Sequence, residues 1–259
     1  MQNGTPKKKT IDPVTLAVIQ NGLSQVANEM DLVQEKTSFS PIVAEALDRA
    51  NGIYRSNSGA VIAQGVTGLP IFVGAMQSTT KAVIDHCGED LADGDVILIN
   101  DPYLGGSHLM DTKLVAPFFY KGKRWCFLSN AAHWADIGGS VPGGFATDAT
   151  EIHQEGLRIP PVKLYRKGVL CQDILDLVLC NIRVPEERIG DIRAQMGAIK
   201  VGKRRLTALL DRYGAELVAE AIDELERRSE QQMRAYIETV PDGTYRFSTY
   251  IDSDGVEDG

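Results

Sequence analysis

The stretch Val96-Ile-Leu-Ile-Asn-Asp-Pro-Tyr-Leu-Gly-Gly-Ser-His-Leu-Met-Asp111 is the part of the sequence that the rest of the chain is built to present. Its apolar start, 96–99, predicts a short buried strand, which ends abruptly at the polar residues that follow. Two consecutive glycines then permit a tight loop, because glycine adopts backbone angles that other residues avoid. Such a loop can turn two side chains of the metal-ligand type, His108 and Asp111, toward one point.

A second strand with the same kind of ending follows. The segment 124–129 is apolar and runs on to His133 and a glycine pair. The brief turn at 121–123 favours placing this strand beside the first, which would bring His133 near His108 and Asp111. Histidines and carboxylates on loops are the usual material of metal sites. The three residues therefore predict a metal site, and this ligand set suits zinc, manganese or iron without distinguishing them.

A structural explanation for each histidine stays open. A single histidine beside a tryptophan, as His133 is beside Trp134, is more often a packed residue than a ligand. The sequence has only 4 histidines, however, and two of them follow strands in glycine-rich loops with a carboxylate three residues on. That coincidence favours a metal site over two unrelated packing residues.

The composition bounds the class of protein. With 259 residues, 43% of them hydrophobic and 24% charged, the chain is long enough for a globular core. A formal net charge of −8 and the lack of an aromatic-interleaved basic patch argue against nucleic acid as a partner. No apolar run approaches the roughly 20 residues that span a bilayer, and no signal-peptide core is present, so we expect a cytoplasmic protein. The 4 cysteines lack CxxC spacing and are expected to be reduced packing residues.

The pattern of the whole chain predicts a mixed α/β fold, with a β-sheet core that presents the loops and a layer of long helices. The first helix should begin at Asp12-Pro13, because the carboxylate can cap it and proline suits the first helical position. The double proline at 160–161 limits the segment 157–165 to a short edge strand. Helices are expected over about 12–35, 74–87, 173–180, 185–213 and 215–238, and a turn at 56–59 predicts a β-hairpin.

Three regions follow from this pattern. Residues 1–170 form the α/β domain with the metal site, 171–240 the helical layer, and 241–259 the start of a further β region. The alternating segment 245–251 predicts a strand without partners, so we expect this chain to be the N-terminal part of a longer protein. The irregular stretch 138–156 is expected to line the site, because long loops inside compact domains are usually functional or mobile.

One near-match to a nucleotide-binding motif is rejected. The segment from Gly197 to Arg204 nearly spells a phosphate-binding P-loop, but Arg204 stands where the motif needs Ser or Thr to hold Mg²⁺. The segment also continues a helical pattern instead of following a strand. We therefore expect any ATP to be bound by another chain.

Several motifs together resemble the hydantoinase B/oxoprolinase family, and the resemblance covers most of the chain from about residue 12 onward. They are 37–41 with the carboxylates that follow, 100–111, 133–139, Glu155-Gly156 ahead of 161–164, and 181–191. The resemblance implies a subunit of a hetero-oligomer that works with a hydantoinase A-like, ATP-binding partner. Members open lactam, hydantoin or 5-oxoproline rings, or carboxylate ketones such as acetone and acetophenone, and they are longer than this chain.

The resemblance also implies a ligand set. His108, Asp111 and His133 fall on the metal-ligand positions of the family, and the metal is expected to be zinc or manganese ahead of iron. A fourth ligand should come from the segment that holds Glu45 and Asp48, and we favour Asp48.

Further residues are implied around the metal. Asp101, Asp136 and Glu155 are candidates for moving the proton, and only geometry can choose among them. The chain departs from several members at 49–51 and by carrying Gly68 and Phe72 where they have histidine. These differences weaken the assignment of a particular ring or ketone.

The implied function is that of an ATP-dependent cyclic amide hydrolase. The partner, which holds ATP and Mg²⁺, phosphorylates the carbonyl or enolate oxygen of the substrate, and the metal of this chain activates water for C–N cleavage. An ATP-dependent ketone carboxylase is the alternative. Two rivals come from other classes: a non-haem iron oxygenase with His108, Asp111 and His133 as a facial triad, and a scaffold whose histidines only pack.

Overall fold

The first long helix begins where the sequence places its cap. In the computed structural model, which describes residues 11–250, α1 spans Pro13–Thr37. The Asp12 carboxylate accepts a hydrogen bond from the backbone N–H of Thr15, as a helix N-cap does. The predicted start of this helix is therefore confirmed, and its apolar stripe is buried.

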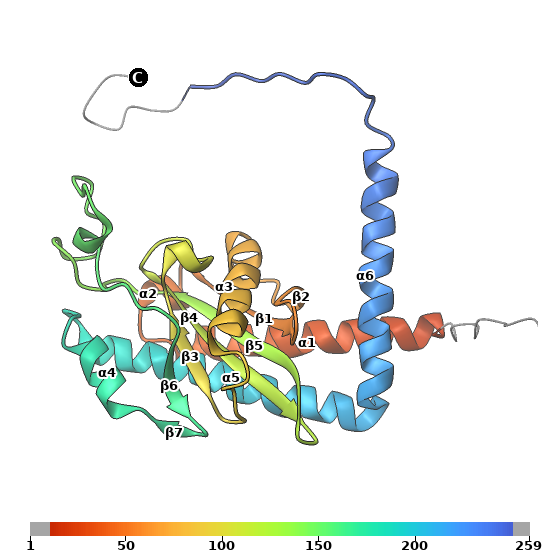
Figure 1. The fold of residues 1–259 in the computed structure, drawn as a ribbon, viewed down its shortest axis with the longest axis horizontal. Coiled ribbons are helices and arrows are strands. Elements are labelled where there is room, and N and C mark those ends of the chain that lie inside the picture. The colour runs from red at the N-terminus through yellow and green to blue at the C-terminus, as the bar shows by residue number, and fades with distance from the viewer. Residues whose placement is uncertain (1–10, 251–259) are drawn as a thin grey trace, which may run out of the picture. The chain divides into compact units, whose positions relative to one another are not determined.

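A seven-stranded sheet forms the centre of the fold (Figure 1). All its neighbouring strands are antiparallel, in the order β2-β1-β5-β4-β3-β6-β7. The predicted hairpin around the turn at 56–59 is confirmed as β1 and β2. The strands are β1 (Arg49–Arg55), β2 (Val61–Gln64), β3 (Val96–Ile99), β4 (Asp111–Tyr120), β5 (Lys123–His133), β6 (Val162–Arg166) and β7 (Val169–Leu170).

The predicted placement of β3 and β5 in one sheet is confirmed, but their predicted direct adjacency is wrong. Strand β4 lies between them, because the turn at 121–122 joins β5 to β4 and not to β3. Strand β4 opens with Asp111, Thr112 and Lys113, which are buried although they are polar. The start of β4 therefore lacks the apolar residues by which a buried strand is predicted from sequence. Strand β5 also runs further than predicted, as far as His133.

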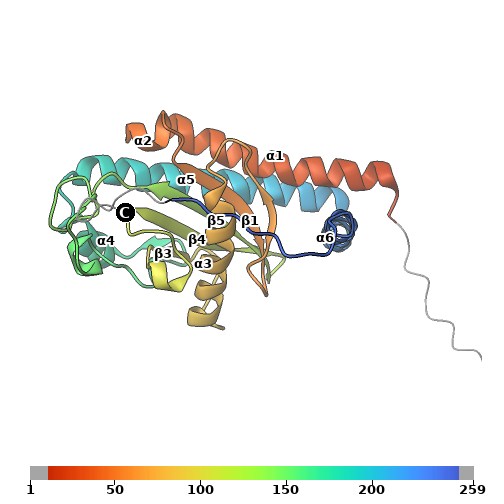
Figure 2. The ribbon, with the colours of Figure 1, turned by 90° about the horizontal axis from the view of Figure 1, so that it is seen from above.

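Helices cover both faces of the sheet (Figure 2). On one face α1 and α5 pack together, and the position of Gly202 in α5 lies against Met30 of α1 and Leu128 of β5. On the other face Phe72 and Met76 of α3 pack on the sheet in an apolar cluster. The mixed α/β class is confirmed. The remaining helices are α2 (Pro41–Ala44), α3 (Ile71–Cys87), α4 (Gln172–Leu179), α5 (Pro185–Tyr213) and α6 (Ala215–Ile237), with short 3₁₀ turns η1 (Pro102–Leu104) and η2 (Ile152–Gln154).

The described residues divide into two compact units, one through Ala221 and one from Ile222 onward. Helices α4 and α5, from the predicted helical layer, share the first unit with the sheet. In the second unit, residues 241–250 form neither helix nor strand, so the strand predicted over 245–251 is absent from its described part. Its side chains are exposed and no strand within residues 11–250 pairs with it, which is why the alternating pattern alone does not produce β structure. No helix among the described residues is long and apolar enough to cross a membrane.

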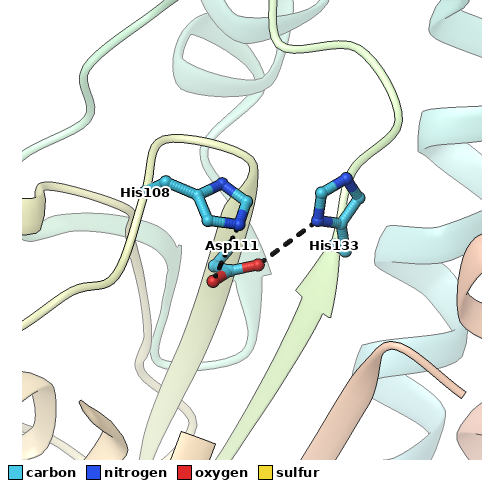
Figure 3. Close-up of side chains that lie close together, drawn as sticks. All are labelled: His108, Asp111 and His133. Carbon is cyan, nitrogen blue, oxygen red and sulfur yellow. Dashed lines mark ion pairs between the residues drawn. The ribbon is translucent and has the colours of Figure 1, made fainter. Parts of the chain in front are cut away.

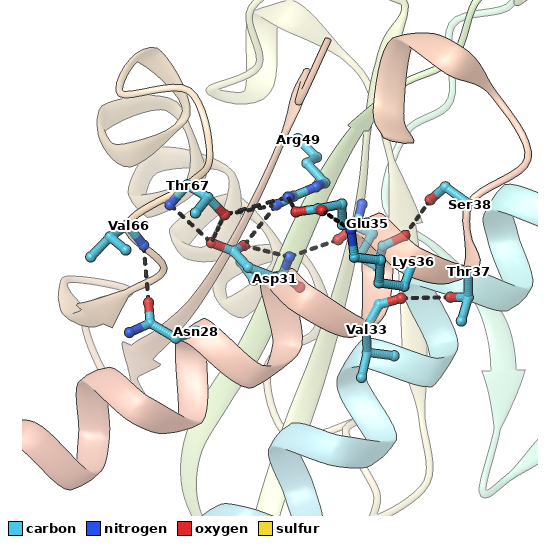
Figure 4. Close-up of polar contacts among 12 residues, drawn as sticks. Asn28, Asp31, Val33, Glu35, Lys36, Thr37, Ser38, Arg49, Val66 and Thr67 are labelled. Carbon is cyan, nitrogen blue, oxygen red and sulfur yellow. Dashed lines mark hydrogen bonds and ion pairs between the residues drawn. The ribbon is translucent and has the colours of Figure 1, made fainter. Parts of the chain in front are cut away.

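A buried polar cluster joins α1 to the start of β1 (Figure 4). The Asp31 carboxylate accepts hydrogen bonds from the Asn51 side chain at 2.9 Å and from the Thr67 hydroxyl at 3.1 Å. Arg49 is fully buried and pairs with Asp31 at 3.4 Å and with Glu35 at 2.7 Å. The cluster holds Arg49 in place, and it therefore also restricts the backbone position of Asp48, which belongs to the candidate site.

A buried ion pair ties α5 to the segment between α1 and α2. Arg188 and Asp191 are both fully buried, with 2.6 Å between Nη1 and Oδ2. The other carboxylate oxygen accepts hydrogen bonds from the backbone N–H groups of Phe39 at 2.8 Å and Ser40 at 3.0 Å. The guanidinium also lies over the Trp134 ring, 5.2 Å from its centroid.

A third buried carboxylate, that of Asp95, lies just before β3. Asp95 accepts hydrogen bonds from the backbone N–H groups of Ala92 and Lys167 and pairs with the Lys163 ammonium at 2.9 Å. Burial opposes ionisation of this carboxyl, but these donors together lower its pKa below the ordinary value. Lys163 lies on β6, the short strand expected next to the double proline. The predicted edge position of this strand is wrong, because the two-residue β7 pairs with β6 and forms the edge.

Candidate metal centre

The antiparallel register of β4 and β5 brings two predicted ligands together. Asp111 opens β4, His133 closes β5, and the two residues are direct partners across the ladder. Directly opposed residues point to the same face of a sheet, so their side chains meet whatever the loops around them do. The distance between His133 Nδ1 and Asp111 Oδ1 is 3.4 Å (Figure 3).

His108 reaches the same point from the loop before β4. Its backbone carbonyl accepts a hydrogen bond from the Asp111 N–H at 3.2 Å, which closes a tight turn. Its Nε2 lies 3.3 Å from Asp111 Oδ2, and its ring centroid lies 5.2 Å from that of His133. One ligand atom from each of the three side chains can be chosen so that all lie within 4.8 Å of one another. The predicted convergence of these three residues is therefore present.

Asp48 lies beside this group and comes from a third segment. Its Oδ2 lies 3.4 Å from His133 Nδ1, and its backbone carbonyl accepts a hydrogen bond from the His133 N–H at 3.0 Å. Leu47 before it adopts a left-handed φ of 59°, and Arg49 after it is locked in the polar cluster. Partial burial raises the pKa of the Asp48 carboxyl. Glu45, the other carboxylate of this segment, is exposed.

Two buried atoms at the centre of the group lack hydrogen-bond partners, although they lie within ion-pair distance of each other. Asp111 Oδ1 and His133 Nδ1 are buried and make no hydrogen bond. Burial without a partner costs free energy, and a bound cation would satisfy both atoms. Burial also lowers the pKa of His108, which favours the neutral imidazole that binds metals. The donor set therefore fits a divalent transition metal.

A serine and a lysine stand behind Asp111. Ser107 Oγ is hydrogen-bonded to Asp111 Oδ2, and Lys113 Nζ donates to Ser107 Oγ at 3.3 Å. Lys113 is fully buried, and burial lowers its pKa to about 8. Sequence reasoning missed both residues, although a residue two places after Asp111 on a strand must point to the same face.

The three predicted proton carriers lie outside this group of ligand atoms. Asp101 caps η1 by accepting a hydrogen bond from the Tyr103 N–H at 3.0 Å. Asp136 accepts hydrogen bonds from two glycine N–H groups and from the Arg183 guanidinium, so both its oxygens are engaged. Glu155 follows η2 at the end of the long loop.

The loop at 138–156 reaches the site through an aromatic residue that the sequence analysis did not single out. The Phe145 ring stacks on the His133 ring with 6.0 Å between centroids and an interplanar angle of 20°. Phe145 is nevertheless 69% exposed. The Asp136 and Arg183 contacts anchor the base of this loop. The expectation that the loop lines the site thus agrees with the position of Phe145.

The fold and the site together are those of an α/β protein with a candidate metal site at one end of its antiparallel sheet. Two histidines and two carboxylates lie there, next to the start of β1, the start of β4 and the end of β5. The chain belongs to the hydantoinase B/oxoprolinase family, whose sequence profile matches residues 12–257. The predicted family membership is confirmed.

Individual relatives agree with this assignment. The chain is 42% identical to caprolactamase subunit beta of Pseudomonas jessenii over 246 residues, which cover 95% of this chain and 42% of that one. The crystal structure of the ATP-dependent caprolactamase from the same organism superposes with a TM-score of 0.85 at 42% identity, over 91% of this chain and 40% of that one. The chain is also 29% identical to the acetophenone carboxylase delta subunit of Aromatoleum aromaticum, over 69% of this chain and 26% of that one. It thus spans less than half the length of these relatives.

Proposed function

We propose that this chain carries the metal site of an ATP-dependent enzyme that opens a cyclic amide of the lactam, hydantoin or 5-oxoproline type. The observation that carries the proposal is the convergence of His108, Asp111 and His133 around buried atoms without hydrogen-bond partners. Asp48 adds a carboxylate oxygen 3.4 Å from His133 Nδ1. The 42% identity to a caprolactamase subunit supports the amide-opening chemistry.

The ligands in this proposal are the two imidazoles and the two carboxylates. Zinc or manganese suits them, and iron ranks behind. When bound, such an ion acts as a Lewis acid and lowers the pKa of bound water toward about 7. Asp111 is well suited to ligation, because the His133 and Ser107 side chains beside it lower its pKa although burial opposes this.

The chain itself positions the substrate and moves protons. Phe145 stacks on His133 and restricts water on that side of the ring. Asp101, Asp136 and Glu155 stay candidates for proton transfer, but both oxygens of Asp136 are engaged in holding the loop. That engagement fits Asp136 better as an anchor. Glu155 is the first proposed carrier, and Asp101 ranks behind it because its oxygens face the Tyr103 N–H and the Arg158 guanidinium.

Nucleotide chemistry is assigned to a hydantoinase A-like partner within a cytoplasmic hetero-oligomer. The near-match to a P-loop lies inside helix α5, where Gly202 packs on Met30 and Leu128 and cannot cradle a phosphate. The partner, with ATP and Mg²⁺, would phosphorylate the substrate oxygen and pass on the activated intermediate. Such an intermediate must be shielded from water during transfer.

A ketone carboxylase is the second candidate, supported by the similarity to the acetophenone carboxylase delta subunit. Assays with lactams and with ketones plus bicarbonate, each with ATP and the partner, separate the two. Oxygen consumption without ATP would favour the non-haem iron oxygenase instead.

The test begins with elemental analysis of the full chain. We expect about one transition metal per chain, loss of the metal in His108→Ala, and retention in His86→Ala, which removes an exposed histidine on α3. Equal metal content in the two variants would contradict the assignment. Turnover of a lactam by this chain without nucleotide and partner would overturn the two-subunit mechanism.

A further inference from the structure

Besides His108, a two-residue relay of Ser107 and Lys113 occupies the side of Asp111 that carries Oδ2. Lys113 lies two residues after Asp111 on β4, so both side chains point to the same face. Ser107 stands between them and contacts both, through Lys113 Nζ at 3.3 Å and Asp111 Oδ2. Lys113 is fully buried, and Ser107 Oγ is the hydrogen-bond partner that the structure gives its ammonium.

The chemistry of lysine fixes the direction of the relay. An ammonium group only donates hydrogen bonds, so Ser107 Oγ accepts from Lys113. The hydroxyl hydrogen of Ser107 is then directed to Asp111 Oδ2, which accepts it. This arrangement engages one carboxylate oxygen and leaves Oδ1, the buried atom without a partner, free beside His133 Nδ1.

Ser107 also acts as a spacer. Without its hydroxyl, the buried ammonium would lose its acceptor, and the opposite charge that acts on it is the Asp111 carboxylate. A direct pair between Lys113 and Asp111 would compete with a cation for the same oxygens. A hydroxyl between the two therefore lets the chain bury a lysine next to a metal ligand without blocking that ligand.

We propose that Ser107 and Lys113 are positioning residues that orient Asp111 for metal binding and hold its Oδ1 free for the ion. This inference rests on the proposed metal site. Partners behind a metal ligand commonly change metal affinity by about 10–100-fold when they are removed.

The test measures the dissociation constant for Zn²⁺ by chelator competition on the full chain, together with the absorption spectrum of the Co²⁺-loaded protein. Ser107→Ala should raise the dissociation constant about 10–100-fold and change the Co²⁺ spectrum. Ser107→Thr keeps the hydroxyl and should stay within about threefold of wild type by the same measure. Thermal unfolding of the metal-free protein shows whether the variants fold alike.

A matched control lies on the same strand. Thr112 sits between Asp111 and Lys113, points to the opposite face, and has a buried hydroxyl without a hydrogen-bond partner. Thr112→Val should leave both the Zn²⁺ affinity and the Co²⁺ spectrum unchanged. A loss of affinity in this variant equal to that of Ser107→Ala would overturn the proposal, because it would reflect general loosening of β4.

The contribution of Lys113 is tested by a double-mutant cycle. If Lys113 orients Ser107, then Ser107→Ala should have a smaller effect in a Lys113→Met background than in wild type. An equal effect in both backgrounds would remove Lys113 from the relay, and no effect of Ser107→Ala in wild type would overturn the proposal as a whole. Absence of metal binding by the wild-type chain would instead refute the proposed function on which the relay rests.

Discussion

Replacing Asp191 tests how the segment that leads to Asp48 is held. Asp191→Asn keeps an oxygen that can accept from the backbone N–H groups of Phe39 and Ser40, but it removes the charge that neutralises Arg188. Breaking a fully buried ion pair by removing one partner costs about 3–5 kcal/mol, because the other charge is left uncompensated. Total stabilities are about 5–15 kcal/mol, so Asp191→Asn should be folded but visibly weakened.

Asp191→Ala removes the acceptor as well as the charge. The buried Ser40 N–H and the partly buried Phe39 N–H then lose their partner. An unsatisfied buried donor costs about 1–3 kcal/mol, so this variant should be less stable than Asp191→Asn by roughly 1 kcal/mol or more. Urea unfolding followed by circular dichroism measures both values. The control is Asp191→Asn combined with Arg188→Met, which removes the buried charge and should recover most of the loss. If Asp191→Asn lowers the free energy of unfolding by less than about 1 kcal/mol, the buried Arg188–Asp191 pair does not stabilise the fold as expected.

Three further predictions concern Asp95, Gly65 and the choice between Asp48 and Glu45. Because hydrogen bonds lower the folded-state pKa of Asp95, its contribution to stability is present above the unfolded pKa near 4 and is lost as pH falls through the lowered value. The difference in unfolding free energy between wild type and Asp95→Asn should therefore be full at neutral pH and shrink below about pH 4; a difference that does not depend on pH would contradict this. Gly65→Ala places a Cβ 1.8 Å from a carboxylate oxygen of the buried polar cluster and should destabilise the chain by more than about 2 kcal/mol in urea unfolding, whereas Gly74→Ala on α3 meets no atom within 4 Å and should be neutral or stabilising. Asp48→Asn should weaken Zn²⁺ binding in chelator competition while Glu45→Gln leaves it unchanged, and the reverse order would assign the fourth ligand to Glu45.

The sequence allowed prediction of those parts of the fold that depend on local signals. The Asp12 cap, the hairpin turn at 56–59 and the apolar run 96–99 each act on neighbouring residues, and each forms the expected element. The position of β4 between β3 and β5 is a long-range choice among strands. Its opening residues are polar because they build the site, so hydrophobic periodicity cannot reveal them.

The site could be predicted in part for the same reason. His108, Asp111 and His133 carry their chemistry in their identity and spacing. Lys113 and Phe145 gain their positions only through packing, one by burial on a strand and the other by stacking on His133. The two-residue spacing places Lys113 on the same strand face as Asp111, but it does not show that this lysine is buried. Sequence likewise does not distinguish a phenylalanine that covers a site from one in the core.

The pairing of Asp111 with His133 makes the site tolerant of some changes in chain length and intolerant of others. A deletion or insertion of one residue within β4 or β5 would turn one of the two side chains to the opposite face, because the side-chain period of a strand is two. Residues added to the turn at 121–122 would leave the pairing untouched. His108, in contrast, is delivered by a loop whose length and composition can change without disturbing the ladder. Evolution or protein engineering can therefore alter the third ligand, and with it the choice of metal, while the ladder keeps the first two in place.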